Sequence, residues 1–301
     1  INIYATFQSF SGILPYNESN KSSKINISNQ GVILDSYFDI DITVLESKLT
    51  TSRIGRPLQV LSKIDSTNEE IRRNLTLPEG AVIIADLQTR GRGRQGRSWH
   101  SEPGKGLYIS TLLKPNLPPE KLFMVTLMAG VATASAIQHL ISLPVKLKWP
   151  NDILLNGKKL AGILCECIPG TPPAVIVGIG INLNQPTFPP DIQDIATSIK
   201  LETGNTINRT DLVLSLLENL EHEYEEFLQE KRKGLTQRWT KKTDMFDKVI
   251  TVYQKGTSLT GIAKGLDQEG RLVLQTIDGK QHALDSGEVS FNAPPSSELG
   301  N

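Results

Sequence analysis

The segment "DILLNGKKLAGILCECI" (residues 152–168) carries the clearest local fold signal in the chain. Its two apolar runs flank Asn156-Gly157, and an Asn-Gly pair in that setting is the strongest short hairpin signal. The segment therefore predicts two antiparallel strands joined by a tight turn. Because side chains alternate along a strand, Lys158 and Lys159 point to opposite faces, and one of them can face inward.

The same alternation places Cys165 and Cys167 on one face of the second strand. A C-x-C pair without further cysteines is a poor zinc site, so packing is favoured over metal binding. Two cysteines cannot form a disulfide framework. The four histidines are scattered, so neither a metal cluster nor a Ser–His nucleophile is expected.

Strand and helix signals continue on both sides of this hairpin. Strands are predicted over residues 58–64, 81–89, 106–114, 145–149 and 174–184, and helices over 65–75, 120–142 and 210–230. Ser66 with Glu69 fits a capping box at the start of the first helix. The helix over 120–142 has apolar or small residues on most faces, which predicts burial. After Trp239, short strands separated by Gly and Asp predict a small β-barrel.

The N-terminal part of the chain lacks such signals. Residues 16–31 are rich in Asn and Ser, which predicts a mobile segment. A DNA-binding domain needs two amphipathic helices joined by a turn, and residues 1–55 do not show them. We therefore expect a partly disordered polar extension (1–55) without a DNA-binding domain, a catalytic domain (56–242), a β-barrel (243–292) and a tail (293–301).

Composition excludes several classes of partner. The 301 residues include 32 basic and 32 acidic side chains, so no global field draws the chain to nucleic acid or membrane. No apolar run reaches the roughly 18 residues of a membrane span, and no signal peptide is evident. These features predict a cytoplasmic protein without membrane or DNA partners.

Positive charge is instead concentrated in "RGRGRQGRSW" (90–99). The letters 91–96 match the G-x-G-x-x-G dinucleotide pattern, but the match is rejected because no helix pattern follows. A nucleic-acid patch is disfavoured by the neutral net charge and by the scarcity of aromatic residues in the loop. An anion-binding active-site loop is the favoured interpretation. In the free protein its arginines repel one another, so we expect the loop to be mobile until anions bind.

Two further stretches suit a nucleotide. "KWPND" (148–152) ends a strand with polar residues, which fits either a simple turn or a site for a nucleotide and Mg²⁺. "GIGIN" (178–182) brings glycines to the end of an apolar strand, where a ligand or another backbone approaches closely. Groups that seek phosphate and carboxylate, without an activated nucleophile, fit the joining of a carboxylate to a nucleotide phosphate.

The motifs "DSTN", "LQTRGRGRQGRSW", "KWPNDI", "GKKLAGIL" and "GIGINLN" occur in the order and spacing of biotin–protein ligases. The resemblance covers about residues 56–292. It implies an α+β fold, with a mixed, mainly antiparallel sheet, flanking helices and a small C-terminal β-barrel. It also implies ATP with Mg²⁺ as co-substrate, biotinyl-5′-AMP as intermediate, and the biotin carboxyl carrier protein of acetyl-CoA carboxylase as acceptor. One departure is Gln95, where members of the family often carry a second Arg.

The resemblance also assigns site residues. For biotin it implies Ser66, Thr67, Asn68, Gln88, Arg92, Gly93, Arg94 and Lys159. For the nucleotide it implies Arg97, Trp99, Lys148, Asn151, Asp152 and Asn182, with Asp152 as a Mg²⁺ ligand. The chemical step falls to Lys159, Arg94 and Arg97. Two alternatives are a lipoate-type ligase and a ligase that also represses transcription; without a DNA-binding pattern, an enzyme alone is expected, as a monomer or weak homodimer.

Overall fold

The computed structural model describes residues 25–28, 31–34, 40–118, 121–170, 172–229, 232–254 and 256–291. The chain forms two compact units, Ile1–Tyr37 and Phe38–Asn301. In the first unit, β1 (Ile25–Ser28) and β2 (Gly31–Leu34) pair antiparallel. The rest of the segment expected to be mobile lies outside the described residues.

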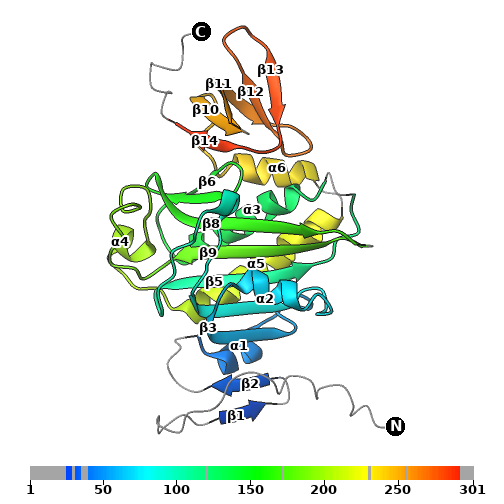
Figure 1. Cartoon of the computed structure of the whole chain (residues 1–301), viewed down its shortest axis with the longest axis vertical. Coiled ribbons are helices and arrows are strands. Elements are labelled where there is room, and N and C mark those ends of the chain that lie inside the picture. The colour runs from blue at the N-terminus through cyan, green and yellow to red at the C-terminus, as the bar shows by residue number, and fades with distance from the viewer. Residues whose placement is uncertain are drawn as a thin grey trace. The chain divides into compact units, whose positions relative to one another are not determined.

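A seven-stranded sheet is the centre of the second unit (Figure 1). Its strands, in spatial order, are β3 (Leu58–Ile64), β4 (Val82–Gln88), β5 (Gly106–Leu113), β9 (Ala174–Asn182), β8 (Lys158–Ile168), β7 (Asp152–Leu155) and β6 (Val145–Lys148). Only β3 and β4 run parallel; the remaining neighbours pair antiparallel. The predicted mixed, mainly antiparallel sheet is confirmed.

The hairpin predicted from Asn156-Gly157 joins β7 to β8. Asn156 has φ 49° and Gly157 has φ 81°. Both residues of a type I′ turn need positive φ, which Asn and Gly tolerate best. The turn chemistry therefore explains the hairpin without help from tertiary contacts.

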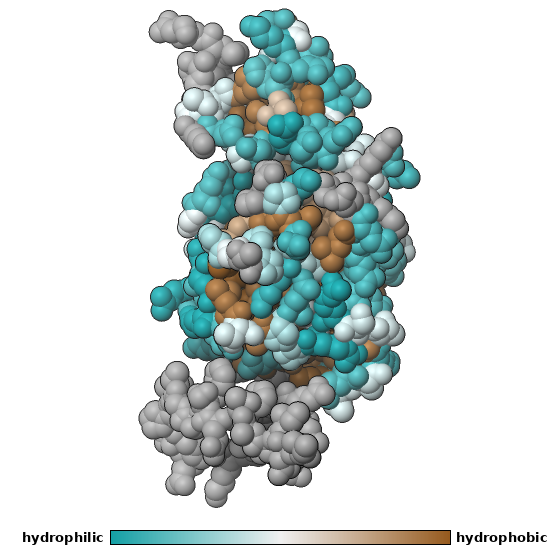
Figure 2. All heavy atoms as spheres, turned by 90° about the vertical axis from the view of Figure 1, so that its right-hand side faces the viewer, coloured by the Kyte–Doolittle hydropathy of each residue, from teal (hydrophilic) through white to brown (hydrophobic). Residues whose placement is uncertain are grey.

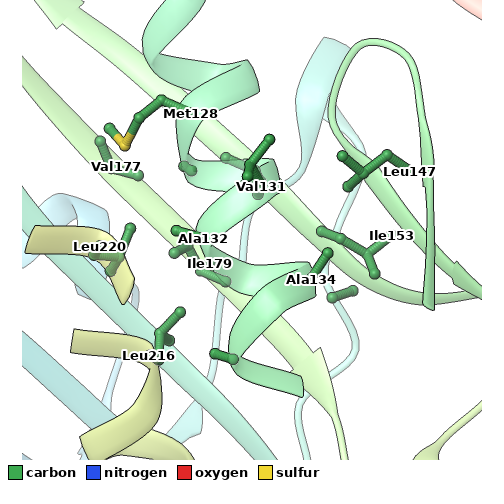
Figure 3. Packing of buried hydrophobic residues seen from close by; sticks show 14 of the residues in the cluster. Met128, Val131, Ala132, Ala134, Leu147, Ile153, Val177, Ile179, Leu216 and Leu220 are labelled. Carbon is green, nitrogen blue, oxygen red and sulfur yellow. The ribbon is translucent and has the colours of Figure 1, made fainter. Parts of the chain in front are cut away.

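One face of the sheet is covered by helices. The helix α3 (Met124–Gln138) is buried along almost its whole length and packs against both the sheet and α5 (Arg209–Leu228); Figure 3 shows Met128, Val131 and their neighbours in this core. Two short helices flank α5 in the chain: α4 (Ile199–Thr203) precedes it and α6 (Arg232–Thr240) follows it. Cys165 packs against this core, and burial raises the pKa of its thiol to about 12, as the packing interpretation predicts.

The opposite face of the sheet carries α2 (Thr67–Arg73) (Figure 1). Ser66 stands at its N-cap, but its side chain makes no capping hydrogen bond, so the predicted capping box does not form. Gln88 at the end of β4 makes a different contact there: its Oε1 accepts from the backbone N–H of Thr67 at 2.9 Å. This hydrogen bond connects the start of α2 to the strand that leads into the arginine loop.

The structure moves the predicted domain boundary at residue 55. Leu45 of α1 (Ile42–Lys48) is 1% exposed, and Leu49 and Ile54 join the same core. The carboxylate of Glu221 accepts the backbone N–H groups of residues 52–54. Residues from 40 onward therefore belong to the same compact unit as the central sheet, a connection that the short, irregular sequence pattern did not reveal.

The C-terminal strands form a five-stranded antiparallel sheet in the order β13-β12-β11-β10-β14. Their bounds are β10 (Val249–Gln254), β11 (Thr257–Leu266), β12 (Leu272–Gln275), β13 (Gln281–Leu284) and β14 (Glu288–Ser290). The short C-terminal strands are confirmed, and among the described residues they form an antiparallel sheet with β13 and β14 as its edges, where a small barrel was predicted. On the face seen in Figure 2, apolar patches interrupt a mainly hydrophilic surface. Within the described part of the chain, no helix combines the length and apolar character of a membrane span.

Candidate active site

A cavity of about 700 Å³ opens on the α2 face of the central sheet. All of the predicted site residues line it: Ser66, Thr67, Asn68, Gln88, Arg92, Gly93, Arg94, Arg97, Trp99, Lys148, Asn151, Asp152, Lys159 and Asn182. They come from the start of α2, the end of β4, the arginine loop and the β6–β7, β8 and β9 segments. The fold thus brings motifs far apart in sequence to one place.

Glycines make the floor of this cavity flat. Gly162 on β8 and Gly180 on β9 are register partners, and the indole of Trp99 lies against both. A Cβ at position 180 would meet the Trp99 ring at 2.5 Å, and one at 162 would meet it at 2.9 Å. "GIGIN" was predicted to permit a close approach, and the approaching group is Trp99. Its buried Nε1 has no hydrogen-bond partner among the described residues.

A polar network fills one end of the cavity. Ser110 Oγ on β5 lies 2.7 Å from Thr67 Oγ1 and donates to Asn68 Oδ1 at 2.6 Å. Thr67 Oγ1 donates to Gln88 Oε1 at 3.2 Å. Such a set of fixed donors and acceptors suits a small polar ligand head. Ser110 was not predicted, because a lone serine inside an apolar strand gives no signal.

The loop arginines have partners, which corrects the expectation that they only repel one another. Arg92 pairs with Glu69 of α2, and its Nη2 lies 3.4 Å from Glu166 Oε1. Arg97 forms a bidentate pair with Glu288 of β14, at 2.8 and 2.9 Å. Arg94 donates to Asn151 Oδ1 at 2.9 Å. Carboxylates of α2, β8 and β14 therefore hold the loop over the cavity.

The backbone of the loop also has a defined form. Residues Arg94–Gly96 form a 3₁₀ turn, and Gln95 within it takes a left-handed φ of 56°. The N–H of Gly93 donates to the carbonyl of Arg97 at 2.7 Å. The side chain at position 95, where the family often has Arg, is exposed and outside the cavity lining.

Lys159 is the inward-facing lysine of the hairpin. Its backbone N–H donates to the carbonyl of Ile195 at 2.8 Å, which fixes its place. Its Nζ forms an ion pair with Asp152, at 2.6 Å from Oδ1. The same Nζ lies 5.6 Å from the centroid of the Trp99 ring. Lys158 points away and lies outside the cavity lining. The predicted division between the two lysines is confirmed.

Two cations of the site are largely withdrawn from water. Burial lowers the pKa of the Lys148 ammonium, while the carboxylate of Asp152 acts in the opposite direction. Burial likewise lowers the pKa of the Arg94 guanidinium. Charges in such surroundings interact strongly with an anion that replaces water. The Lys148 Nζ also lies 5.7 Å from the ring centroid of Phe291, so the C-terminal sheet reaches the same site.

A divalent cation would find few protein ligands here. No group of three or more His, Cys, Asp or Glu side chains in the described ranges could hold a metal ion. Asp152, at the start of β7, and Asn151, just before it, offer side-chain oxygens. Both side chains are already in contact with cationic side chains, those of Lys159 and Arg94. The donor set fits Mg²⁺ held mainly by phosphate oxygens and water, and does not fit a metal held by the protein alone.

Two family models match the chain: the Biotin/lipoate A/B protein ligase family over residues 59–182, and the Biotin protein ligase C terminal domain over residues 247–292. The Bifunctional ligase/repressor BirA of Bacillus subtilis is 36% identical over 242 residues, which cover 77% of this chain and 73% of that protein. The Biotin--[acetyl-CoA-carboxylase] ligase of Mycobacterium tuberculosis is 30% identical, over 78% and 88%. The biotin protein ligase of Aquifex aeolicus, solved in complex with biotin and ATP, superposes with a TM-score of 0.69 at 32% identity, over 77% and 97%. The chain belongs to the biotin protein ligase family, and it is a ligase.

Proposed function

We propose that the protein activates biotin with ATP as biotinyl-5′-AMP and transfers it to a lysine of the biotin carboxyl carrier protein of acetyl-CoA carboxylase. The observation that carries this proposal is the single cavity in which a polar network at one end adjoins Lys159, Arg94 and Lys148. The biotin and ATP bound by the Aquifex relative support the substrates, and the name of the Mycobacterium relative supports the acceptor.

In the first step, a carboxylate oxygen of biotin attacks the α-phosphorus of ATP. The bond from that phosphorus to the β-phosphate oxygen breaks, and pyrophosphate leaves. Carboxylate and triphosphate repel each other, and positive charge fixed in a dry cavity offsets that repulsion. We assign the carboxylate to Lys159 and Arg94, and the phosphates to Arg97 and Lys148.

In the second step, the neutral amine of the carrier lysine attacks the acyl carbon of the mixed anhydride. The bond between that carbon and the phosphate oxygen breaks, AMP leaves, and the new amide nitrogen loses a proton. The anhydride also reacts with water, so a loop that excludes water protects it. Arg92 and Gly93 are proposed to cover the biotinyl group from this loop.

The remaining residues receive binding roles. Ser66, Thr67, Asn68 and Gln88 are proposed to bind biotin, and Trp99, Asn151, Asp152 and Asn182 to bind the nucleotide. Asp152 would be the protein ligand of the Mg²⁺ that accompanies ATP, and this ion would neutralise part of the phosphate charge.

The decisive experiment is isotopic pyrophosphate exchange with biotin and, separately, with lipoate. Exchange with biotin alone, followed by labelling of an apo-carrier domain, is expected. Exchange with lipoate alone would favour the second candidate, a lipoate ligase, which the name of the matched family allows.

Three further expectations belong to this proposal. Some relatives are named ligase/repressor, so the expected absence of DNA binding needs a gel shift with DNA upstream of the protein's own operon. Sedimentation would test the expected monomer or weak homodimer. A cytoplasmic location agrees with its two free cysteines, Cys165 and Cys167.

A further inference from the structure

Glu166 lies beside the cavity but does not line it. It follows Gly162 and Leu164 on the same face of β8, and its side chain is 16% exposed. Its Oε1 accepts from Arg72 Nη2 at 2.7 Å, and its Oε2 accepts from Asn68 Nδ2 at 2.7 Å. Besides its 3.4 Å contact with Arg92 of the loop, this carboxylate thus lies between Arg72 and a cavity-lining amide, and that second contact has no assigned role.

The amide of Asn68 is almost fully used within the protein. Its Nδ2 donates to Glu166 and also to the carbonyl of Leu164, at 3.3 Å. Its Oδ1 accepts from Ser110 at 2.6 Å. An amide has two N–H donors and one oxygen with two lone pairs. The remaining capacity of Asn68 is therefore a single lone pair on Oδ1, which can only accept a hydrogen bond.

The charge of Glu166 decides this orientation. If the amide turned over, Oδ1 would face the Glu166 carboxylate and the Leu164 carbonyl, and no proton would lie between these oxygens. An ionised carboxylate can only accept hydrogen bonds, so Nδ2 of Asn68, and not Oδ1, must face it. Arg72 fixes the other oxygen of the carboxylate by a charge-assisted hydrogen bond. A glutamine at position 166 could donate or accept a hydrogen bond, so it would no longer favour one orientation of the Asn68 amide over the other.

We propose that Glu166 is a positioning residue for biotin, which acts by orienting Asn68 so that its Oδ1 accepts from an N–H group of the ligand. The proposal rests on the proposed biotin specificity of the cavity. Glu166 does not touch the ligand, and the proposed effect is transmitted by Asn68. Its longer contact with Arg92, at 3.4 Å, does not orient that amide.

The test measures biotin binding by titration calorimetry without nucleotide, for the unsubstituted protein, Glu166→Gln, Asn68→Asp and the double variant. Glu166→Gln is expected to weaken the Kd for biotin about tenfold. Asn68→Asp alone sets two carboxylates against each other and weakens binding at least as much. In the double variant, the glutamine can donate to the aspartate, whose other oxygen still accepts from the ligand. The double variant should therefore bind at least about tenfold more tightly than Asn68→Asp.

The matched control is Glu70→Gln, on the same helix as Asn68. Glu70 pairs with Arg73 at 2.7 Å and does not line the cavity, so its Kd should stay within about twofold of the unsubstituted protein. A merely structural role of Glu166 predicts additive losses in the double variant, and that result overturns the proposal. Normal binding by Glu166→Gln overturns it as well.

A second measurement needs no substitution. In nitrogen-labelled protein, the side-chain amide protons of Asn68 should exchange slowly with solvent, because both are hydrogen-bonded. Exchange at the rate of a free amide would overturn the proposal even if Glu166→Gln failed to fold. Absence of biotin binding by the unsubstituted protein would overturn the proposed function along with it.

Discussion

The arginine loop should open readily in the free enzyme and close when its ligands bind. The Arg92 and Arg97 side chains are 46% and 57% exposed in their ion pairs. Exposed pairs of this kind contribute about 0.2–1 kcal/mol each. Fixing the loop backbone costs roughly 1–2 kcal/mol per residue. The protein's own carboxylates therefore give the loop a preferred position without holding it there firmly.

Ligands change this balance. Charge-assisted hydrogen bonds to a carboxylate or phosphate are worth about 1.5–3 kcal/mol each. Two of them would add about 3–6 kcal/mol, which reduces the open population by roughly two to four powers of ten. Cleavage by a protease follows the open population when opening is fast. Trypsin should therefore cut between residues 90 and 97 rapidly in the free enzyme, more slowly with biotin, and at least about 100-fold more slowly with biotin plus MgATP.

The variant Glu288→Gln tests the contact with the C-terminal sheet. It removes the charge that pairs with Arg97, and should raise cleavage of the free enzyme by up to about fivefold. Glu70→Gln, which loses an ion pair with Arg73 that includes none of the loop arginines, is the control. Equal cleavage rates in the free, biotin-bound and biotin–MgATP states would refute the closing loop, whatever reaction the enzyme catalyses.

Two other substitutions and two truncations have defined outcomes. Lys159→Ala should lower pyrophosphate exchange by about 10²–10³ with an unchanged circular dichroism spectrum; near-normal exchange would contradict its assignment. Because burial lowers the pKa of Lys148, its ammonium loses its proton at a lower pH than a free lysine. The KM for ATP should accordingly rise on the alkaline side, and Lys148→Arg should move that rise to higher pH; identical profiles would count against the role. Deleting residues 1–37 should leave biotinylation within about twofold, whereas deleting 1–50 also removes buried Leu45, at about 1.5–3 kcal/mol for each large apolar side chain lost. Equal melting temperatures of the two truncations would refute the new boundary.

Local chemistry explains which parts of the fold could be predicted. The hairpin follows from Asn156-Gly157, whose positive φ values need no distant contact. Strand alternation predicts that one of Lys158 and Lys159 faces inward, and the family resemblance indicated Lys159. The capping box does not form, and the side-chain acceptor found at the start of α2 is the distant Gln88, which accepts from the backbone N–H of Thr67.

The unpredicted residues share a different property. Glu166 contacts Arg72 across 94 positions of sequence, and Glu288 contacts Arg97 across 191. Each is a single acidic residue on a strand, where charge usually means exposure to solvent. No periodic pattern connects such a residue to its partner, so only the folded chain identifies them as the carboxylates around the site.

The glycines of the central sheet also limit how the loop can move. The Trp99 indole, at the end of the loop, rests on Gly162 and Gly180, and the backbone N–H of Trp99 donates to the Gly91 carbonyl at 2.9 Å. A Cβ at Gly91 would meet the Trp99 carbonyl oxygen at 2.7 Å, so only glycine allows this contact. The two ends of the loop are thus joined to each other and seated on a rigid sheet. Opening is therefore expected to move residues 92–98 as a flap, because both of its hinges stay fixed on the floor of the cavity.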